Sequence, residues 1–183
     1  GYDTHQYTNI RYPFPFDPPY VPQDIPCGAY VHNFEYHREK KASKAFLNFE
    51  GVDSCFYVWV NGAYAGYSQV PHATSEFDVT DLLNEGENTL AVLVLKWCDG
   101  SYLEDQDKFR MSGIFRDVYL LKRPETTIRD YYITTDVEKD RVTVKLDMYF
   151  SEPVETKVTI EDKYGAVVAR GEAAEDGVLE LTV

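Results

Sequence analysis

The polar stretch from Trp97 to Arg110 contains the residue types best suited to chemistry. Four carboxylates fall within nine residues: Asp99, Glu104, Asp105 and Asp107. Such acids repel one another unless hydrogen-bond donors, a cation or a ligand hydroxyl compensates. Aromatic residues are interleaved with them: Trp97, Tyr102 and Phe109. Because carboxylates accept from sugar hydroxyls while aromatic faces cover the apolar side of a sugar ring, the stretch predicts a sugar-contacting loop. A solvated acidic loop is the alternative.

Asn9, within Tyr7-Thr8-Asn9, is a second candidate, because an amide can both donate to and accept from a hydroxyl. A turn-capping asparagine is the alternative. The spacing of an EF-hand calcium loop is not met from Asp99, although a looser cation site using Asp99 or Asp107 remains open. The four histidines lack metal-ligand spacing, and the sequence has neither a nucleophile elbow nor a phosphate loop. It shows no complete catalytic apparatus.

Charge and cysteine content narrow the class of protein. The 183 residues carry 18 basic and 31 acidic side chains, a net charge of −13 that would repel phosphate backbones and anionic lipid heads. We therefore expect neither nucleic acid nor membrane as a partner. The three cysteines form no CxxC pair and predict reduced, buried thiols: Cys27, Cys55 and Cys98.

Most of the chain has the pattern of short strands. Six prolines between Arg11 and Pro26 predict an extended arm over a surface. Apolar alternation then predicts strands at 29–36, 44–49, 54–60, 76–79 and 89–97. Asn61-Gly62 predicts a tight hairpin with positive φ at both residues. The only helical hint is a single turn at 79–84. An all-β sandwich or jelly roll is expected.

A polar stretch at 122–126 interrupts this pattern, and a second strand series follows. The boundary predicts two domains, residues 1–123 and residues 124–183. Strands are expected at 128–134, 141–149, 154–160 and 166–173, with a turn at 162–165. Four or five strands fall short of the roughly seven of a complete immunoglobulin-like sandwich. Residues 124–183 are therefore expected to be a partial immunoglobulin-like β-sandwich.

One long match resembles a known family. The run 101–107, followed by Arg110-Met111-Ser112-Gly113-Ile114-Phe115-Arg116-Asp117-Val118, closely resembles the end of the N-terminal sugar-binding domain of β-galactosidases of glycoside hydrolase family 2. Further matches lie at 1–3, 7–9, 18–22, 58–62, 66–69 and 75–78. The resemblance covers residues 1–123, whereas residues 124–183 resemble the next, immunoglobulin-like domain of the family only in pattern.

The resemblance implies a galactose-binding-domain-like jelly roll that is N-terminally truncated, since family members have additional strands before the equivalent of Gly1. It implies that a (β/α)8 barrel absent here holds both catalytic carboxylates and hydrolyses terminal β-D-galactosides with retention. No catalytic residue is expected in this chain, and we expect it to be inactive alone. Asn9 and Asp107 would contact galactose, and Asp107 would also help hold Na⁺. Asp99 and Gln69 would be ligands of a peripheral Mg²⁺.

The resemblance also suggests partners and limits. A β-galactoside, the barrel of the same polypeptide and, through exposed strand edges, a homo-oligomer are the expected partners. A cytoplasmic location is expected, with a periplasmic or secreted one left open. Lys108-Phe109 replaces the family's Met-Trp, so the wall beside Asp107 would differ, while Glu104 and Asp105 are expected to be structural or solvated acids.

Three alternatives remain open at this stage. The chain could be a free-standing carbohydrate-binding module, part of a β-glucuronidase-like hydrolase of the same family, or a pure interface domain. β-Glucuronidases share the Gly-Ile-Phe-Arg element at 113–116 but lack the Glu-Asp-Gln-Asp stretch at 104–107, so a β-galactosidase is preferred.

Overall fold

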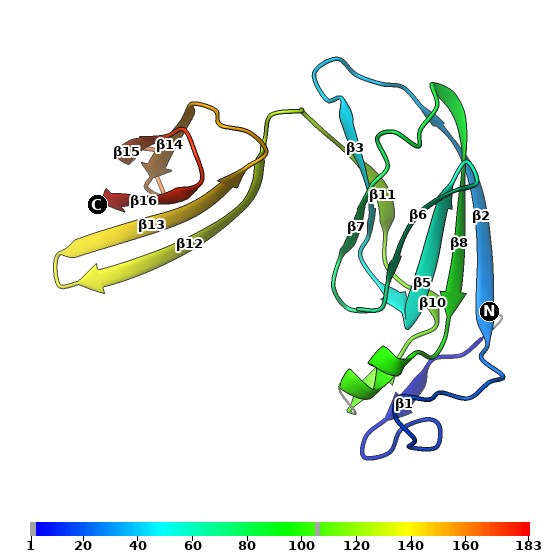
Figure 1. Ribbon diagram of the computed structural model, residues 1–183. Coiled ribbons are helices and arrows are strands. Elements are labelled where there is room, and N and C mark those ends of the chain that lie inside the picture. The colour runs from blue at the N-terminus through cyan, green and yellow to red at the C-terminus, as the bar shows by residue number, and fades with distance from the viewer. Residues whose placement is uncertain (1–2, 105–106) are drawn as a thin grey trace. The chain divides into compact units, whose positions relative to one another are not determined.

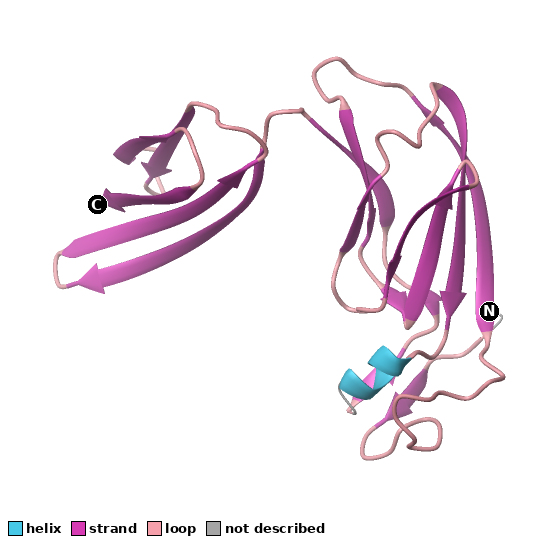
Figure 2. Ribbon diagram, viewed as in Figure 1, coloured by secondary structure: helices cyan, strands magenta, loops and turns pink. Residues whose placement is uncertain are grey.

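The computed structural model describes residues 3–104 and 107–183, and divides the chain into two compact units, residues 1–123 and 124–183. Figure 1 shows both units, which are described separately below. As Figure 2 shows, the described chain is built almost wholly of strands, with one short helix. This confirms the expected all-β class. No helix among the described residues is long and apolar enough to cross a membrane.

The first unit contains a four-stranded and a three-stranded antiparallel sheet. The larger sheet has the order β2-β8-β5-β6, with bounds Cys27–Tyr36, Gly86–Leu95, Cys55–Val60 and Ala63–Ser68. The smaller has the order β11-β3-β7, with bounds Val118–Arg123, Lys44–Phe49 and Ser75–Asp78. A single core cluster draws residues from both sheets, which makes the unit a β-sandwich.

Alternation along β5 explains the core. Phe56, Val58 and Val60 are at most 2% exposed, whereas the residues between them lie on the opposite face. Phe49 of β3 meets Phe56 with ring centroids 4.8 Å apart. Burying each such side chain contributes about 1.5–3 kcal/mol. The sequence alternation therefore places one face of this sheet against the smaller sheet.

The predicted hairpin joins β5 to β6. Asn61 and Gly62 have φ angles of 53° and 81°, as a turn with positive φ at both residues requires. The Asn61 amide also donates to the carbonyl of Leu82 and to Asn88 Oδ1, at 2.8 and 2.7 Å. These bonds tie the turn to the neighbouring loop.

Short elements cluster at one end of the first unit. They are β1 (Gln6–Thr8), β4 (Val52–Asp53), the 3₁₀ helix η1 (Asp99–Leu103), β9 (Lys108–Arg110) and β10 (Gly113–Ile114). β1 pairs with β9, and β10 pairs with β4. Sequence periodicity missed η1, because a single turn carries no apolar repeat. Its start is instead fixed by the buried Ser101, whose hydroxyl accepts from the Cys98 amide.

The weak helical hint at 79–84 forms no helix, as expected of a single turn, and Val79 and Leu83 are held in the sandwich core. One expectation was wrong. Of the three thiols expected to be buried, Cys27 is exposed, because it begins the edge strand β2. Cys55 and Cys98 are buried, and all three cysteines are free thiols.

The second unit is also antiparallel. One sheet has the order β12-β13-β16 and the other pairs β14 with β15. The strand bounds are Ile128–Glu138 for β12, Arg141–Phe150 for β13, Thr156–Glu161 for β14, Val167–Ala173 for β15 and Gly177–Thr182 for β16. The turn at 162–165 forms with Gly165 at φ 84°. β16 was not anticipated, since its short alternating run follows the acidic Glu175-Asp176 pair.

Candidate functional site

The pairing of β1 with β9 brings the two predicted sugar-contacting residues to the same place. Gln6, Tyr7 and Thr8 face Arg110, Phe109 and Lys108 in antiparallel register. The next position along each strand is Asn9 on one side and Asp107 on the other. These two residues, about 100 apart in the sequence, are therefore neighbours in space. Both residues are exposed.

Tyr7 joins Asn9 to Asp107. Its hydroxyl donates to Asp107 Oδ1 at 2.5 Å. The Asp107 carboxylate raises the pKa of Tyr7, while a hydrogen bond with Asn9 acts in the opposite direction. An amide, a phenol and a carboxylate thus form one exposed polar cluster. This combination can both donate to and accept from the hydroxyls of a neutral ligand.

Glu104 has a different role from Asp107, although both belong to the same acidic run. Its Oε2 accepts from Lys108 Nζ at 2.7 Å and from Arg110 at 2.8 Å. Its Oε1 accepts from the Ser54 hydroxyl at 3.0 Å. The Glu104 side chain is only 9% exposed, so it is a structural acid that holds the loop rather than a free general acid or base. Asp105 lies outside the described residues.

Arg110 connects this ion-pair network to β1. Its side chain is 2% exposed, and its Nε donates to the Thr8 hydroxyl at 3.1 Å. The guanidinium also lies 5.8 Å from the ring centroid of Tyr12. Arg110 therefore contacts Glu104, the Pro-rich arm and β1 at the same time.

Asp53 is buried beside the same network. It is 3% exposed, and its Oδ2 has no hydrogen-bond partner among the described residues. Burial raises the pKa of Asp53 to about 6, and the nearby Glu104 acts in the same direction. Lys108, Arg110 and the Met111 amide oppose the shift. Asp53 of β4 is thus an acid whose pKa burial holds above its ordinary value beside this network.

The Lys108-Phe109 pair shapes the wall beside Asp107. The Lys108 side chain is 15% exposed and its charge is paired with Glu104. Phe109 is 60% exposed and packs near Tyr7, with ring centroids 5.4 Å apart, and near His5 at 6.1 Å. The wall is therefore aromatic, since the lysine charge is neutralised away from solvent.

The Pro-rich arm packs on η1 through Tyr102. The Tyr12 hydroxyl donates to the Tyr102 carbonyl at 2.9 Å, and the Tyr102 hydroxyl donates to the Tyr20 carbonyl at 2.6 Å. The Tyr102 ring also lies within 5.5 Å of Tyr12, Phe14 and Phe16, centroid to centroid. This aromatic cluster orders an arm whose prolines prevent strand pairing.

Asp99 and Gln69, the expected magnesium ligands, meet around Gly100. A Cβ added at Gly100 would lie 3.4 Å from the Gln69 amide. Asp99 Oδ1 accepts from the Gly100 amide at 2.9 Å, and Gln69 Oε1 accepts from the Tyr67 hydroxyl at 2.8 Å. These oxygens suit Mg²⁺ in type, as the carboxylate of Asp107 suits Na⁺. They do not suffice in number, because the described residues contain no cluster of three His, Cys, Asp or Glu placed to hold a metal.

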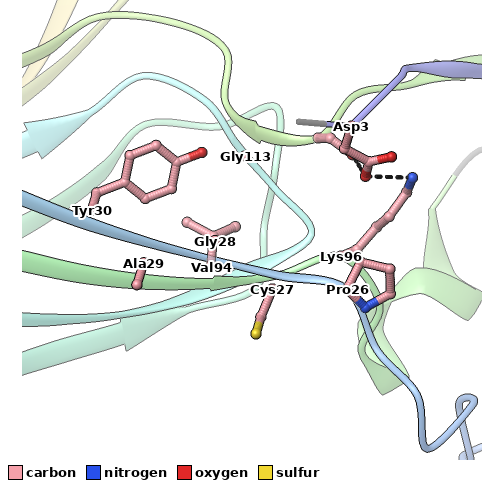
Figure 3. A pocket seen from close by; sticks show the side chains of 10 residues that line it. Asp3, Pro26, Cys27, Gly28, Ala29, Tyr30, Val94, Lys96 and Gly113 are labelled. Carbon is pink, nitrogen blue, oxygen red and sulfur yellow. Dashed lines mark hydrogen bonds and ion pairs between the residues drawn. The ribbon is translucent and has the colours of Figure 1, made fainter. Parts of the chain in front are cut away.

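A separate cavity of about 800 Å³ lies at the start of β2 (Figure 3). Lys96, 7% exposed, donates to Asp3 Oδ2 at 2.6 Å, and the Ser112 hydroxyl donates to the same oxygen at 2.7 Å. These bonds lower the pKa of Asp3 to about 2. Lys96, Asp3 and Ser112 thus bond to one another, and neither Asn9 nor Asp107 lines the cavity. It is therefore distinct from the β1–β9 cluster.

Sequence reasoning did not single out Tyr7, Arg110 or Asp53. Tyr7 stood within the quoted Tyr7-Thr8-Asn9 run, and its position two residues before Asn9 was the only signal available. Asp53 carried no local signal, because the charged groups around it lie far away in the sequence. Arg110 ends the predicted polar stretch, but its bond to Thr8, 102 residues away, could not be predicted from a local pattern.

Comparisons with known proteins show the family of the chain. Residues 1–124 match the sequence profile of "Glycosyl hydrolases family 2, sugar binding domain". The β-galactosidase of Actinobacillus pleuropneumoniae is 55% identical over 153 residues, which are 82% of this chain and 15% of that protein. The β-galactosidase of Vibrio cholerae is 42% identical over 182 residues, which are 97% of this chain and 18% of that protein. The chain thus spans less than a fifth of the length of these relatives.

Solved structures give the same fold. A β-glucuronidase from an uncultured Clostridium sp. superposes with a TM-score of 0.72 at 27% identity, over 86% of this chain and 30% of that one. The β-glucuronidase of Lactobacillus rhamnosus gives 0.73 at 23% identity, over 85% and 29%. The profile match and the β-galactosidase sequences, not these structures, establish that the chain belongs to the glycosyl hydrolases of family 2 and that its first unit is their sugar binding domain.

Proposed function

We propose that this chain forms one wall of the galactose site of a β-galactosidase whose catalytic carboxylates lie in a barrel outside these 183 residues. The observation that carries the proposal is the adjacency of Asn9 and Asp107, joined by the Tyr7 hydroxyl. These groups offer both donors and acceptors to sugar hydroxyls, and Phe109 offers an aromatic face beside them.

The substrate class is a terminal β-D-galactoside of the lactose type, hydrolysed with retention. Identity of 42–55% to curated β-galactosidases supports this class. The β-glucuronidases among the solved structures are only 18–27% identical to the chain, so a glucuronide substrate is the less favoured reading. The role of the chain is to position the sugar. Glu104 is engaged in ion pairs and does not act as a general acid or base.

The ions belong to the same proposal. Asp107 would provide one oxygen to Na⁺, and Asp99 and Gln69 would provide two to a peripheral Mg²⁺. The remaining ligands would come from outside the described residues, since hard cations need about six or more oxygens. A bound cation would offset the negative charge of these acids. We further propose a homo-oligomeric, cytoplasmic enzyme that acts in carbohydrate metabolism.

The test uses a complete β-galactosidase polypeptide that carries these residues. Asp107→Asn should keep the fold, lower kcat/KM for a chromogenic galactoside by about 100-fold or more, and abolish any sodium response, because a charged acceptor is lost in the site. Unchanged kinetics would reduce Asp107 to a solvated loop residue. Glu152→Gln, an exposed acid in the second unit, is the matched control and should leave kcat/KM unchanged.

The isolated chain gives a second test. It should not hydrolyse the chromogenic galactoside, because the proposed acid/base and nucleophile lie elsewhere. Turnover by the isolated chain that survives purification to homogeneity would refute the assignment of catalysis to a separate barrel.

A further inference from the structure

The outer face of the four-stranded sheet carries a cluster of four aromatic rings that the proposed galactose site does not use. Tyr57 and Trp59 alternate with core residues along β5, so their side chains leave the opposite face of the sheet. Tyr67 and Tyr64 of β6 stand directly opposite them in the register. The ring centroids are 4.8 Å apart for Tyr57 and Tyr67, and 6.0 Å apart for Trp59 and Tyr64.

A β-bulge makes this arrangement possible. The register shifts between Val58 and Trp59, so Trp59 pairs with Tyr64 and not with Ala65. Gly66 marks the inward face, because a Cβ there would collide with the Phe77 ring of the core at 2.4 Å. Tyr67 therefore points outward, and the extra residue turns Tyr64 outward as well. Without the bulge, simple alternation would send Tyr64 inward.

The face is neutral and partly open to solvent. Tyr64 is 57% exposed and Tyr67 is 38% exposed. On β8, the residues opposite Tyr57 and Trp59 are Leu93 and Ala91, so the cluster is flanked by apolar side chains. The Tyr67 hydroxyl donates to Gln69 Oε1 at 2.8 Å at one end of the cluster. A chain with a net charge of −13 thus presents an uncharged aromatic surface with phenol groups at its rim.

We propose that this aromatic face is a second carbohydrate-binding surface, and that its ligand is a neutral oligosaccharide. Aromatic rings cover the C–H faces of sugars, and the phenol groups can bond to hydroxyls. An uncharged surface on an acidic protein suits a neutral ligand, whereas an anionic polysaccharide would be repelled. The inference shares with the proposed function the premise that this domain contacts sugar, but its four aromatic rings are not those of the proposed galactose site.

The test is affinity electrophoresis of the 183-residue chain through native gels containing neutral β-1,4-galactan, with anionic polygalacturonate as the comparison. Galactan should retard the chain and polygalacturonate should not. Tyr64→Ala should weaken the apparent affinity about tenfold, since one stacking ring is lost. Tyr64→Phe should keep it, because the ring face remains. Trp59→Ala should act like Tyr64→Ala, with thermal unfolding used to check that each variant is folded.

Two control variants separate the surfaces. Tyr132→Ala removes a ring that is 70% exposed in the second unit and should leave retardation unchanged. Asp107→Asn should also leave it unchanged. Loss of retardation in Asp107→Asn with full retardation in Tyr64→Ala would overturn this inference while leaving the proposed function intact. The inference also fails if galactan does not retard the parent chain. It fails as well if Tyr64→Ala changes the oligomeric state measured by sedimentation but not the retardation, which would identify the face as a protein interface.

Discussion

The buried carboxyl of Asp53 should give the first unit a measurable pH dependence of stability. Its pKa is about 6 in the folded chain, against an ordinary 3.8, chiefly because burial disfavours the charged form. Below about pH 4 both the folded and the unfolded states hold the proton. Between about pH 4 and 6 only the folded state holds it, so stability falls as the pH rises through this window. Above about pH 6 the loss is complete and constant.

The magnitude follows from the difference between the two pKa values. About two pH units at 1.36 kcal/mol each correspond to about 3 kcal/mol. Asp53→Asn keeps the shape and the acceptor for the Met111 amide but cannot ionise. The free energy of unfolding of Asp53→Asn, minus that of the parent chain, should therefore increase by about 3 kcal/mol between pH 3.5 and pH 7.

The assay is urea unfolding followed by tryptophan fluorescence at a series of pH values. Both tryptophans, Trp59 and Trp97, lie in the first unit, so the signal reports that unit. Other titrating groups are present in both proteins, so their contributions cancel in the difference. The lowered pKa of Asp3 reduces the free energy of unfolding only below about pH 4. The lowered pKa of His72 reduces it as the pH falls below about 6.5. A difference that stays flat from pH 3.5 to 7 would refute the reasoning.

Three further predictions concern the loop, the hairpin and the metal ligands. Glu104→Gln should lower the free energy of unfolding by about 3–5 kcal/mol in urea titrations, because Lys108 and Arg110 lose their buried counter-charge; a loss below 1 kcal/mol would count against the network. Gly62→Ala should cost about 1 kcal/mol by the same assay, since φ is 81° and no neighbour lies within 4 Å to add a clash. In a complete β-galactosidase, Asp99→Ala should reduce the rise in Tm on adding Mg²⁺ without changing KM, and a change confined to galactose specificity would contradict this role.

Local patterns were enough to predict most of the sandwich. The strand at Lys44–Phe49 was predicted with its observed bounds, and the Asn61-Gly62 hairpin formed as expected. Strand alternation and turn chemistry act over a few residues, so the sequence displays them directly. The five-residue helix η1 and the short strands β1 and β9 were not predicted, since elements of this length depend on distant partners.

The sequence by itself determined the all-β class, the acidic net charge and the family resemblance, because composition, alternation and long motifs are displayed in consecutive residues. Only the tertiary structure decided which acid faces inward. Glu104 pairs with Lys108 and Arg110, whereas Asp107, three residues later, meets Tyr7, which lies 100 residues earlier in the sequence. It also decided that Tyr64 shares a face with Trp59, because a one-residue bulge reverses the side-chain direction that strict alternation would assign.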